Sequence, residues 1–150
     1  MNPIKEKLYR HCQDYINQSI TTAEQAITAA EEAMESETKS TSGDKHETGR
    51  AMKQLEVEAF GHRLDEALVQ KDQLALVDIS RPYEKVETGA LVYTSFGNFF
   101  IAVSADEIMI DNEEYCIISP DSPIAQAMMN LAAGASFSFR NRGVRISNVQ

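Results

Sequence analysis

Cysteine is scarce in this chain, and its scarcity excludes two kinds of scaffold. The 150 residues contain two cysteines, Cys12 and Cys116, which lie in different halves of the sequence. Neither belongs to a pair with the spacing of a zinc site, and two isolated cysteines cannot make a disulfide framework. We therefore expect each of them to be a small apolar residue, buried or half-buried in the fold.

Basic residues are also few. There are 14 Lys and Arg residues against 23 Asp and Glu residues, which gives a formal net charge of −9. Binding to nucleic acid depends on Lys and Arg side chains that neutralise phosphates. The composition therefore argues against unaided binding to DNA or RNA, although a partner can still bring an acidic protein next to nucleic acid.

Long apolar runs and the common catalytic signatures are missing as well. No apolar run is long enough to span a membrane, and residues 1–7 lack the apolar stretch of a secretory signal. There is no G-x-S-x-G, no glycine-rich phosphate loop and no Cys–His or zinc pattern with a known signature. We therefore expect a cytoplasmic protein with no membrane partner, which is not an independent enzyme and has no small-molecule substrate.

Helical periodicity dominates the first half of the chain. From residue 3 to about residue 38, apolar residues recur at steps of three and four, and after Pro3 no glycine or proline interrupts them. A helix of this length measures about 50 Å at 1.5 Å per residue, so we expect it to extend beyond a compact domain. Its narrow apolar stripe is typical of packing against one neighbouring helix in a coiled coil. The stripe consists of Ile4, Leu8, Cys12, Tyr15, Ile16, Ile20, Ala23, Ile27, Ala30 and Met34.

A second helix is predicted from Asp44 to about Ile79, after a break rich in Ser, Thr and Gly. The Arg81–Pro82 pair ends it, because the residue before a proline is pushed out of the helical region. The apolar register drifts by about one residue near Ala59. Residues 1–80 are thus predicted to form a helical hairpin with an acidic tip at residues 40–50. The predicted apolar positions of the second helix are Met52, Leu55, Ala59, Phe60, Leu64, Ala67, Leu68, Leu74 and Ala75.

The pattern of apolar residues changes at Tyr83. Residues 83–150 are predicted to form a small antiparallel domain with one short helix on its sheet. The helix starts with Ser122 as its N-cap and Pro123 as its first residue, and Ala133–Gly134 closes it. The fold class is therefore α+β. The predicted strands cover residues 90–94, 99–103, 107–110, 114–118, 135–140 and 143–149, with hairpin turns at residues 111–113 and 141–142.

Two acidic residues at the predicted tip, Asp44 and Glu47, allow two interpretations. Asp at the N-cap and Glu three residues later form a capping box, which satisfies free N–H groups at a helix start. Carboxylates are also the hard oxygen ligands that Mg²⁺ prefers, and two of them can complete a magnesium site without making one alone. The neighbouring Lys45, His46 and Arg50 form a solvated loop or contact phosphate.

Two stretches of the sequence, together with this layout, resemble bacterial Gre-type transcript cleavage factors. The first is residues 43–51, in which Gly-Asp is followed three residues later by Glu, as at the tip of the family's hairpin. The second is residues 118–128 with Ala133–Gly134 behind it, which is similar to the family's C-terminal Ser-Pro-Ile/Leu segment and its later glycine. The resemblance covers nearly the whole chain in layout and is specific at residue level in these two stretches.

The resemblance implies an accessory factor of RNA polymerase with an FKBP-like domain at residues 83–150. Asp121, Ser122 and Pro123 match the segment by which the family docks on the polymerase, and the hairpin would enter the secondary channel. Asp44 and Glu47 would act as catalytic residues by helping to hold the second Mg²⁺ of the polymerase active site, which then cleaves backtracked RNA. The free protein would hold no cofactor of its own.

The resemblance also implies a partner beyond the polymerase itself. Within the complex, the hairpin tip would lie beside the nascent RNA 3′ end, where Lys45, His46 and Arg50 are the candidate contacts.

Departures from the family pattern leave two further interpretations open. Thr48 and Ala51 stand where the family usually has Asn and an aromatic residue. Acidic residues stand where many members carry a basic patch: Glu24, Glu31, Glu32, Glu35 and Glu37. The protein could therefore be a channel-binding regulator that does not cleave RNA. The other interpretation is a coiled-coil adaptor with no link to polymerase.

Overall fold

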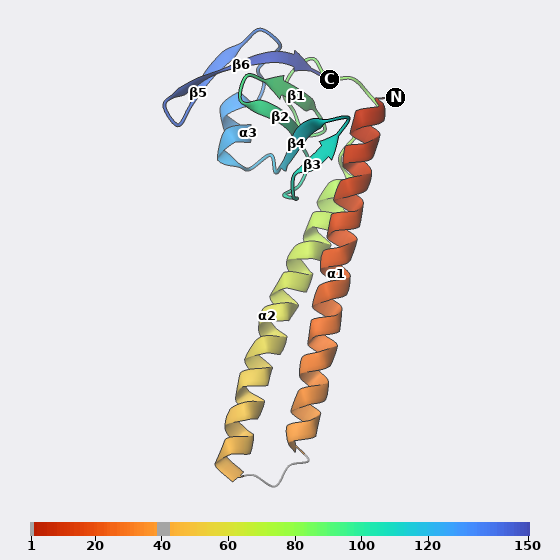
Figure 1. Cartoon of the computed structure of the whole chain (residues 1–150), viewed down its shortest axis with the longest axis vertical. Helices are drawn as coiled ribbons and strands as arrows, with labels where there is room; N and C mark the ends of the chain where they lie inside the picture. Colours follow the sequence, from red (N-terminus) through yellow and green to blue (C-terminus); the bar gives the residue numbers. More distant parts are fainter. Residues whose placement is uncertain (1, 39–42) are drawn as a thin grey trace. The chain divides into compact units, whose positions relative to one another are not determined.

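The computed structural model describes residues 2–38 and 43–150, with no side-chain description for residues 37, 38 and 43–46. Two long helices, α1 (Pro3–Thr38) and α2 (Gly43–Ala75), form a hairpin and are followed by six strands and a short helix (Figure 1). The α+β class expected from the sequence is thereby confirmed. The chain divides into two compact units, residues 16–71 and residues 1–15 with 72–150.

Helix α1 has the bounds predicted from its apolar spacing. Its start is capped by Asn2, whose Oδ1 accepts hydrogen bonds from the backbone N–H groups of Ile4 at 2.9 Å and Lys5 at 3.2 Å. The predicted stripe is largely the buried face of the helix. Its fully buried members are Leu8, Cys12, Ile16, Ala23 and Ala30.

Helix α2 uses the predicted face in its second half, where Phe60, Leu64 and Ala67 have low exposure, but not in its first half. Met52 and Leu55 are exposed, at 62% and 65% of their surface. The less exposed positions recur without interruption at steps of three and four, so there is no drift near residue 59. The prediction failed because apolar residues are spread around α2 instead of lying on one side. The positions of lower exposure are Lys53, Val57, Phe60, Leu64 and Ala67.

The end of α2 also lies earlier than predicted, at Ala75 instead of Ile79. The last turn tightens, because Leu76 N–H bonds Gln73 O and Val77 N–H bonds Leu74 O across three residues. Asp78 Oδ1 then accepts a hydrogen bond from Ser80 N–H at 2.8 Å, which stabilises a turn in place of a further helical turn.

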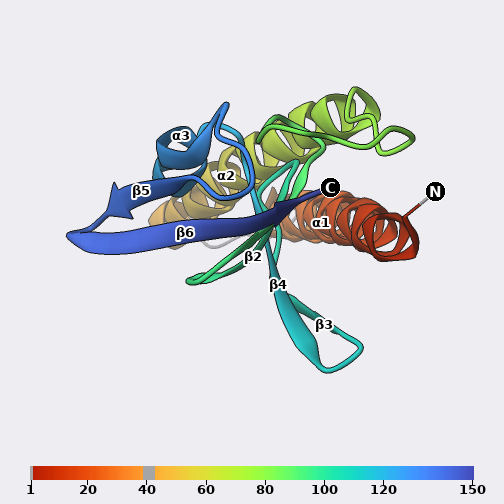
Figure 2. The same ribbon diagram turned by 90° about the horizontal axis from the view of Figure 1, so that it is seen from above.

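The six strands form one sheet in the order β3-β4-β2-β1-β6-β5. Figure 2 shows the β3–β4 pair and the β5–β6 pair at opposite sides of this sheet. All pairings are antiparallel except that of β2 with β4, which is parallel, so the sheet is mixed instead of wholly antiparallel. The strands are β1 (Leu91–Thr94), β2 (Gly97–Ile101), β3 (Ile108–Ile110), β4 (Glu113–Ile118), β5 (Ser136–Phe139) and β6 (Arg142–Val149).

Two tight turns set the register of the outer strand pairs. Asp111 and Asn112 join β3 to β4 with φ of 52° and 66°, and Arg140 and Asn141 join β5 to β6 with φ of 52° and 63°. Positive φ at both central residues is the requirement of a type I′ hairpin turn, which matches the twist of the strands. The second turn lies one residue before the predicted position, because Arg142 already belongs to β6.

The short helix α3 (Pro123–Met128) packs against β5 and covers the apolar core of the sheet. It ends before the predicted Ala133–Gly134, because Asn130 adopts a left-handed φ of 68° and its N–H bonds Val86 O. The core residues are Tyr83, Val86, Ala90, Val92, Phe99, Ile101, Ala125, Met128 and Ile146. Among the described residues, no helix has an apolar stretch that would cross a membrane.

Both cysteines occupy the environments expected from the sequence. Cys12 is buried in α1 and Cys116 is half-buried in β4, and both are free thiols. Burial raises the pKa of the Cys12 thiol to about 12, so the thiol stays protonated and unreactive at neutral pH.

Candidate functional site

The acidic pair lies at the start of α2. The helix begins at Gly43, so Asp44 belongs to its first turn and is not the N-cap that the capping-box interpretation required. A carboxylate in the first turn is still favoured by the positive end of the helix dipole. The side chains of Asp44, Lys45 and His46 lie outside the described part of the chain, as do residues 40–42 of the predicted tip.

Glu47 lies one helical turn after Asp44, and its side chain is exposed. Residues three apart on a helix are neighbours on the same face, with about 5–6 Å between their Cβ atoms. The backbone of α2 therefore places the two carboxylate-bearing residues side by side, next to the connection between the helices. This is the arrangement that a shared cation would require of them.

Arg50 lies in acidic surroundings. Together with Glu31, Met34 and Glu35 of α1, it lines a shallow hollow of about 310 Å³ in the unit formed by residues 16–71. Glu24 and Glu32 are exposed on the same helix. This part of the hairpin presents mainly negative charge. The described part of α1 therefore offers no row of basic residues that would continue the candidate RNA contacts Lys45, His46 and Arg50.

The second candidate site, Asp121-Ser122-Pro123, is a rigid turn at the start of α3. Ser122 Oγ donates a hydrogen bond to Ser119 O at 2.8 Å and accepts one from Ala125 N–H at 3.4 Å. Asp121 N–H donates to Ser119 Oγ at 3.1 Å. Asp121 and Pro123 remain exposed, so the turn presents a carboxylate and an apolar ring on a fixed backbone.

Replacing the N-cap by Ser122→Ala is expected to lower the free energy of unfolding by about 1 kcal/mol, because the first turn of α3 loses its side-chain acceptor. Urea titration followed by circular dichroism measures this loss. Ser138→Ala, at an exposed position of β5, is the control and should change stability by less than about 0.5 kcal/mol. Equal effects of both substitutions would contradict the capping role.

The structure also shows one three-ligand group that the sequence did not suggest. Carboxylate oxygens of Glu107 and Glu114 and the thiol of Cys116 lie within 4.8 Å of one another, in the part of the chain that the structure describes. A hydrogen bond with Glu107, together with charge repulsion from it, raises the pKa of Glu114. Both effects favour the protonated form of Glu114.

A buried lysine is the other feature that sequence reasoning missed. Lys5 is 1% exposed, and its ammonium group lies 4.4 Å from the centroid of the Tyr83 ring. The signal was present in the spacing, because Lys5 precedes Leu8 by three residues and so lies on the buried face of α1. Lysine is seldom fully buried, and sequence reasoning did not single out this position.

Comparison with known proteins gives a structural likeness but no family match. No protein-family model matches the chain, and no curated protein matches its sequence. The solved structure titled "Structure of the transcription factor Gfh1" is similar over 95% of this chain and 92% of that chain, with 17% identity and a TM-score of 0.34. A likeness at this TM-score does not assign a function, so a functional proposal has to rest on the residues themselves.

Proposed function

We propose that this chain is a Gre-like transcription factor that binds RNA polymerase and promotes cleavage of backtracked RNA. The observation that carries the proposal is the position of Asp44 and Glu47, side by side at the start of α2 and next to the connection between two long helices. A separate β unit carries the docking candidate. On this proposal the protein is an accessory factor, and the polymerase performs the chemistry.

The chemistry of the pair fits a metal that is shared with the polymerase. Mg²⁺ takes hard oxygen ligands and keeps several waters, so two carboxylates on one helical turn complete a site that other groups begin. When bound there, Mg²⁺ supplies charge stabilisation and an activated water for hydrolysis of the RNA backbone. On this proposal Asp44 and Glu47 contribute oxygen ligands from one turn of the helix, and Lys45, His46 and Arg50 contact RNA phosphate.

The turn before α3 is the proposed docking element. Ser122 holds the backbone of the turn, whereas the exposed Asp121 and Pro123 are available to a partner. A carboxylate presented on a rigid turn pairs well with a Lys or Arg on the partner, and little conformational entropy is lost on binding. Asp121 is therefore the residue whose charge should matter most for affinity.

Asp121→Asn is expected to weaken binding to the cognate RNA polymerase about tenfold, which corresponds to about 1.4 kcal/mol for the loss of one charged contact. Thermal stability should not change. Surface plasmon resonance on immobilised polymerase measures the affinity. The matched control is Asp111→Asn, an exposed Asp in a turn whose positive φ asparagine also tolerates.

Two outcomes would count against docking through this turn. Equal affinity of both variants would remove Asp121 from the interface. A wild-type protein that fails to bind polymerase at all would favour the coiled-coil adaptor. If the wild type binds but leaves backtracked RNA intact, the protein is a regulator of the channel without cleavage activity.

A further inference from the structure

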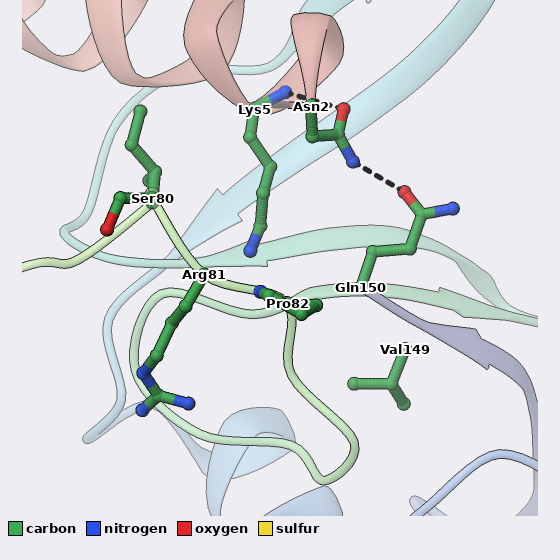
Figure 3. Close-up of a pocket in the computed structure, with 8 residues that line it drawn as sticks. Asn2, Lys5, Ser80, Arg81, Pro82, Val149 and Gln150 are labelled. Atoms are coloured by element: carbon green, nitrogen blue, oxygen red, sulfur yellow. Dashed lines mark hydrogen bonds between the residues drawn. The ribbon is translucent and has the colours of Figure 1, made fainter.

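The ammonium group of Lys5 lacks a hydrogen-bond partner in the part of the chain that the structure describes. Its side chain is 1% exposed and extends from α1 toward the Arg81–Pro82 segment (Figure 3). The face of the Tyr83 ring, 4.4 Å away, provides a cation–π contact but no acceptor for the three N–H groups. A buried ammonium without an oxygen partner is costly and calls for a counter-ion.

The charged groups around Lys5 do not supply that counter-ion. The guanidinium of Arg81 lies 3.9 Å from the centroid of the same Tyr83 ring, and it makes ion pairs at 3.8 Å with Asp78 and with Glu87. Burial, followed by repulsion from Arg81, lowers the pKa of Lys5 to about 8, while Asp78 acts in the opposite direction. Asp78 and Glu87 therefore each pair with Arg81, and neither makes a hydrogen bond to the ammonium of Lys5.

A cavity of about 390 Å³ lies beside this lysine, within the unit formed by residues 1–15 and 72–150. Its volume lies in the range of about 300–1,000 Å³ found for small-molecule sites. One part of the wall is polar, where Asn2 Nδ2 donates to Gln150 Oε1 at 2.7 Å (Figure 3). Another part is apolar. The lining residues are Asn2, Lys5, Ile79, Ser80, Arg81, Pro82, Val149 and Gln150.

We propose that this cavity binds a small aliphatic monocarboxylate, whose carboxylate pairs with Lys5 and whose hydrocarbon tail packs on Ile79, Pro82 and Val149. A carboxylate supplies the oxygen acceptor that the ammonium of Lys5 lacks, whereas a phosphate dianion would bring a second charge close to Asp78. Lys5 is among the residues that line the cavity, which places it beside a carboxylate bound there. This binding site involves neither RNA polymerase nor the proposed magnesium ligands Asp44 and Glu47.

The test is titration of the intact protein with sodium butyrate, followed by NMR of lysine side chains labelled at Cε. Saturation with butyrate should raise the pKa of Lys5 by about one unit, which corresponds to a tenfold preference of the ligand for the protonated lysine. Lys5→Met should abolish butyrate binding. Lys7→Met removes an exposed lysine from the same helix and should leave binding unchanged.

Each of three other results would overturn the proposal. A Lys5 signal that does not respond to butyrate would mean that the cavity takes no carboxylate. An equal response to inorganic phosphate would show a general anion site without selectivity for a monocarboxylate. Undiminished butyrate binding by a folded Lys5→Met variant would place the ligand elsewhere. The wild-type titration decides the question even if Lys5→Met fails to fold.

Discussion

The double variant Asp44→Asn/Glu47→Gln is expected to lose RNA cleavage by about 100-fold or more in a backtracked complex of the cognate polymerase, while it still binds the polymerase. Loss of groups that merely support metal ligands costs about 10–100-fold. Removing two proposed ligands should therefore reach or exceed the upper end of that range. The measurement is the rate at which labelled RNA is shortened, with factor added at a concentration that saturates binding.

The control for this experiment removes the same charge from another part of α2. Asp65→Asn/Glu66→Gln changes two exposed residues and should cleave like the wild type. If the tip variant also cleaves like the wild type, then Asp44 and Glu47 are not the catalytic pair. If neither the wild type nor the tip variant cleaves RNA although both bind the polymerase, Asp44 and Glu47 stabilise the start of α2. The factor then regulates the channel without cleaving RNA.

Gly89→Ala is expected to cause the largest loss of stability, about 3 kcal/mol. Gly89 has φ of +101°, and an added Cβ would collide with Tyr83 Oη and lie 2.8 Å from Asp78 O. The buried Tyr83 hydroxyl donates to that same carbonyl at 2.6 Å. The substitution therefore combines backbone strain of about 1–3 kcal/mol with disruption of a hydrogen bond worth about 1 kcal/mol. Urea unfolding measures the sum.

Gly134→Ala separates the two contributions. Gly134 has a similar φ of +91°, but an added Cβ there would meet no atom within 4 Å. Only the backbone strain remains, and the expected loss is about 1–2 kcal/mol. Equal losses at the two glycines would show that the contact with Tyr83 contributes nothing.

Sequence reasoning succeeded where the spacing of apolar residues was compatible with only one type of secondary structure. The unbroken spacing after Pro3 predicted both ends of α1, and β-branched, aromatic and alternating residues predicted the six strands to within two residues. It failed on the first half of α2, where Met52 and Leu55 are exposed and Lys53 and Val57 have lower exposure instead. When apolar residues surround a helix, the contacts of the folded chain decide which of them are buried.

The candidate sites show the same division. Asp44, Glu47 and the turn at Ser122 were selected from short motifs and a family resemblance, and their roles stay predictions. Lys5 was missed because its environment depends on Tyr83 and Arg81, which lie far along the chain. No pattern in residues 2–12 alone reveals that an aromatic ring and a second cation will be placed beside this lysine.

The position of β1 in the sheet has a consequence for synthesis on the ribosome. β1 lies between β2 and β6, and Val92 pairs with Val149 across the β1–β6 ladder. One edge of β1 therefore stays without its partner strand until residues 142–149 have left the exit tunnel. An open strand edge is a template for pairing with another chain. Nascent chains that stall before residue 142 should consequently be the species most prone to aggregate and to need a chaperone.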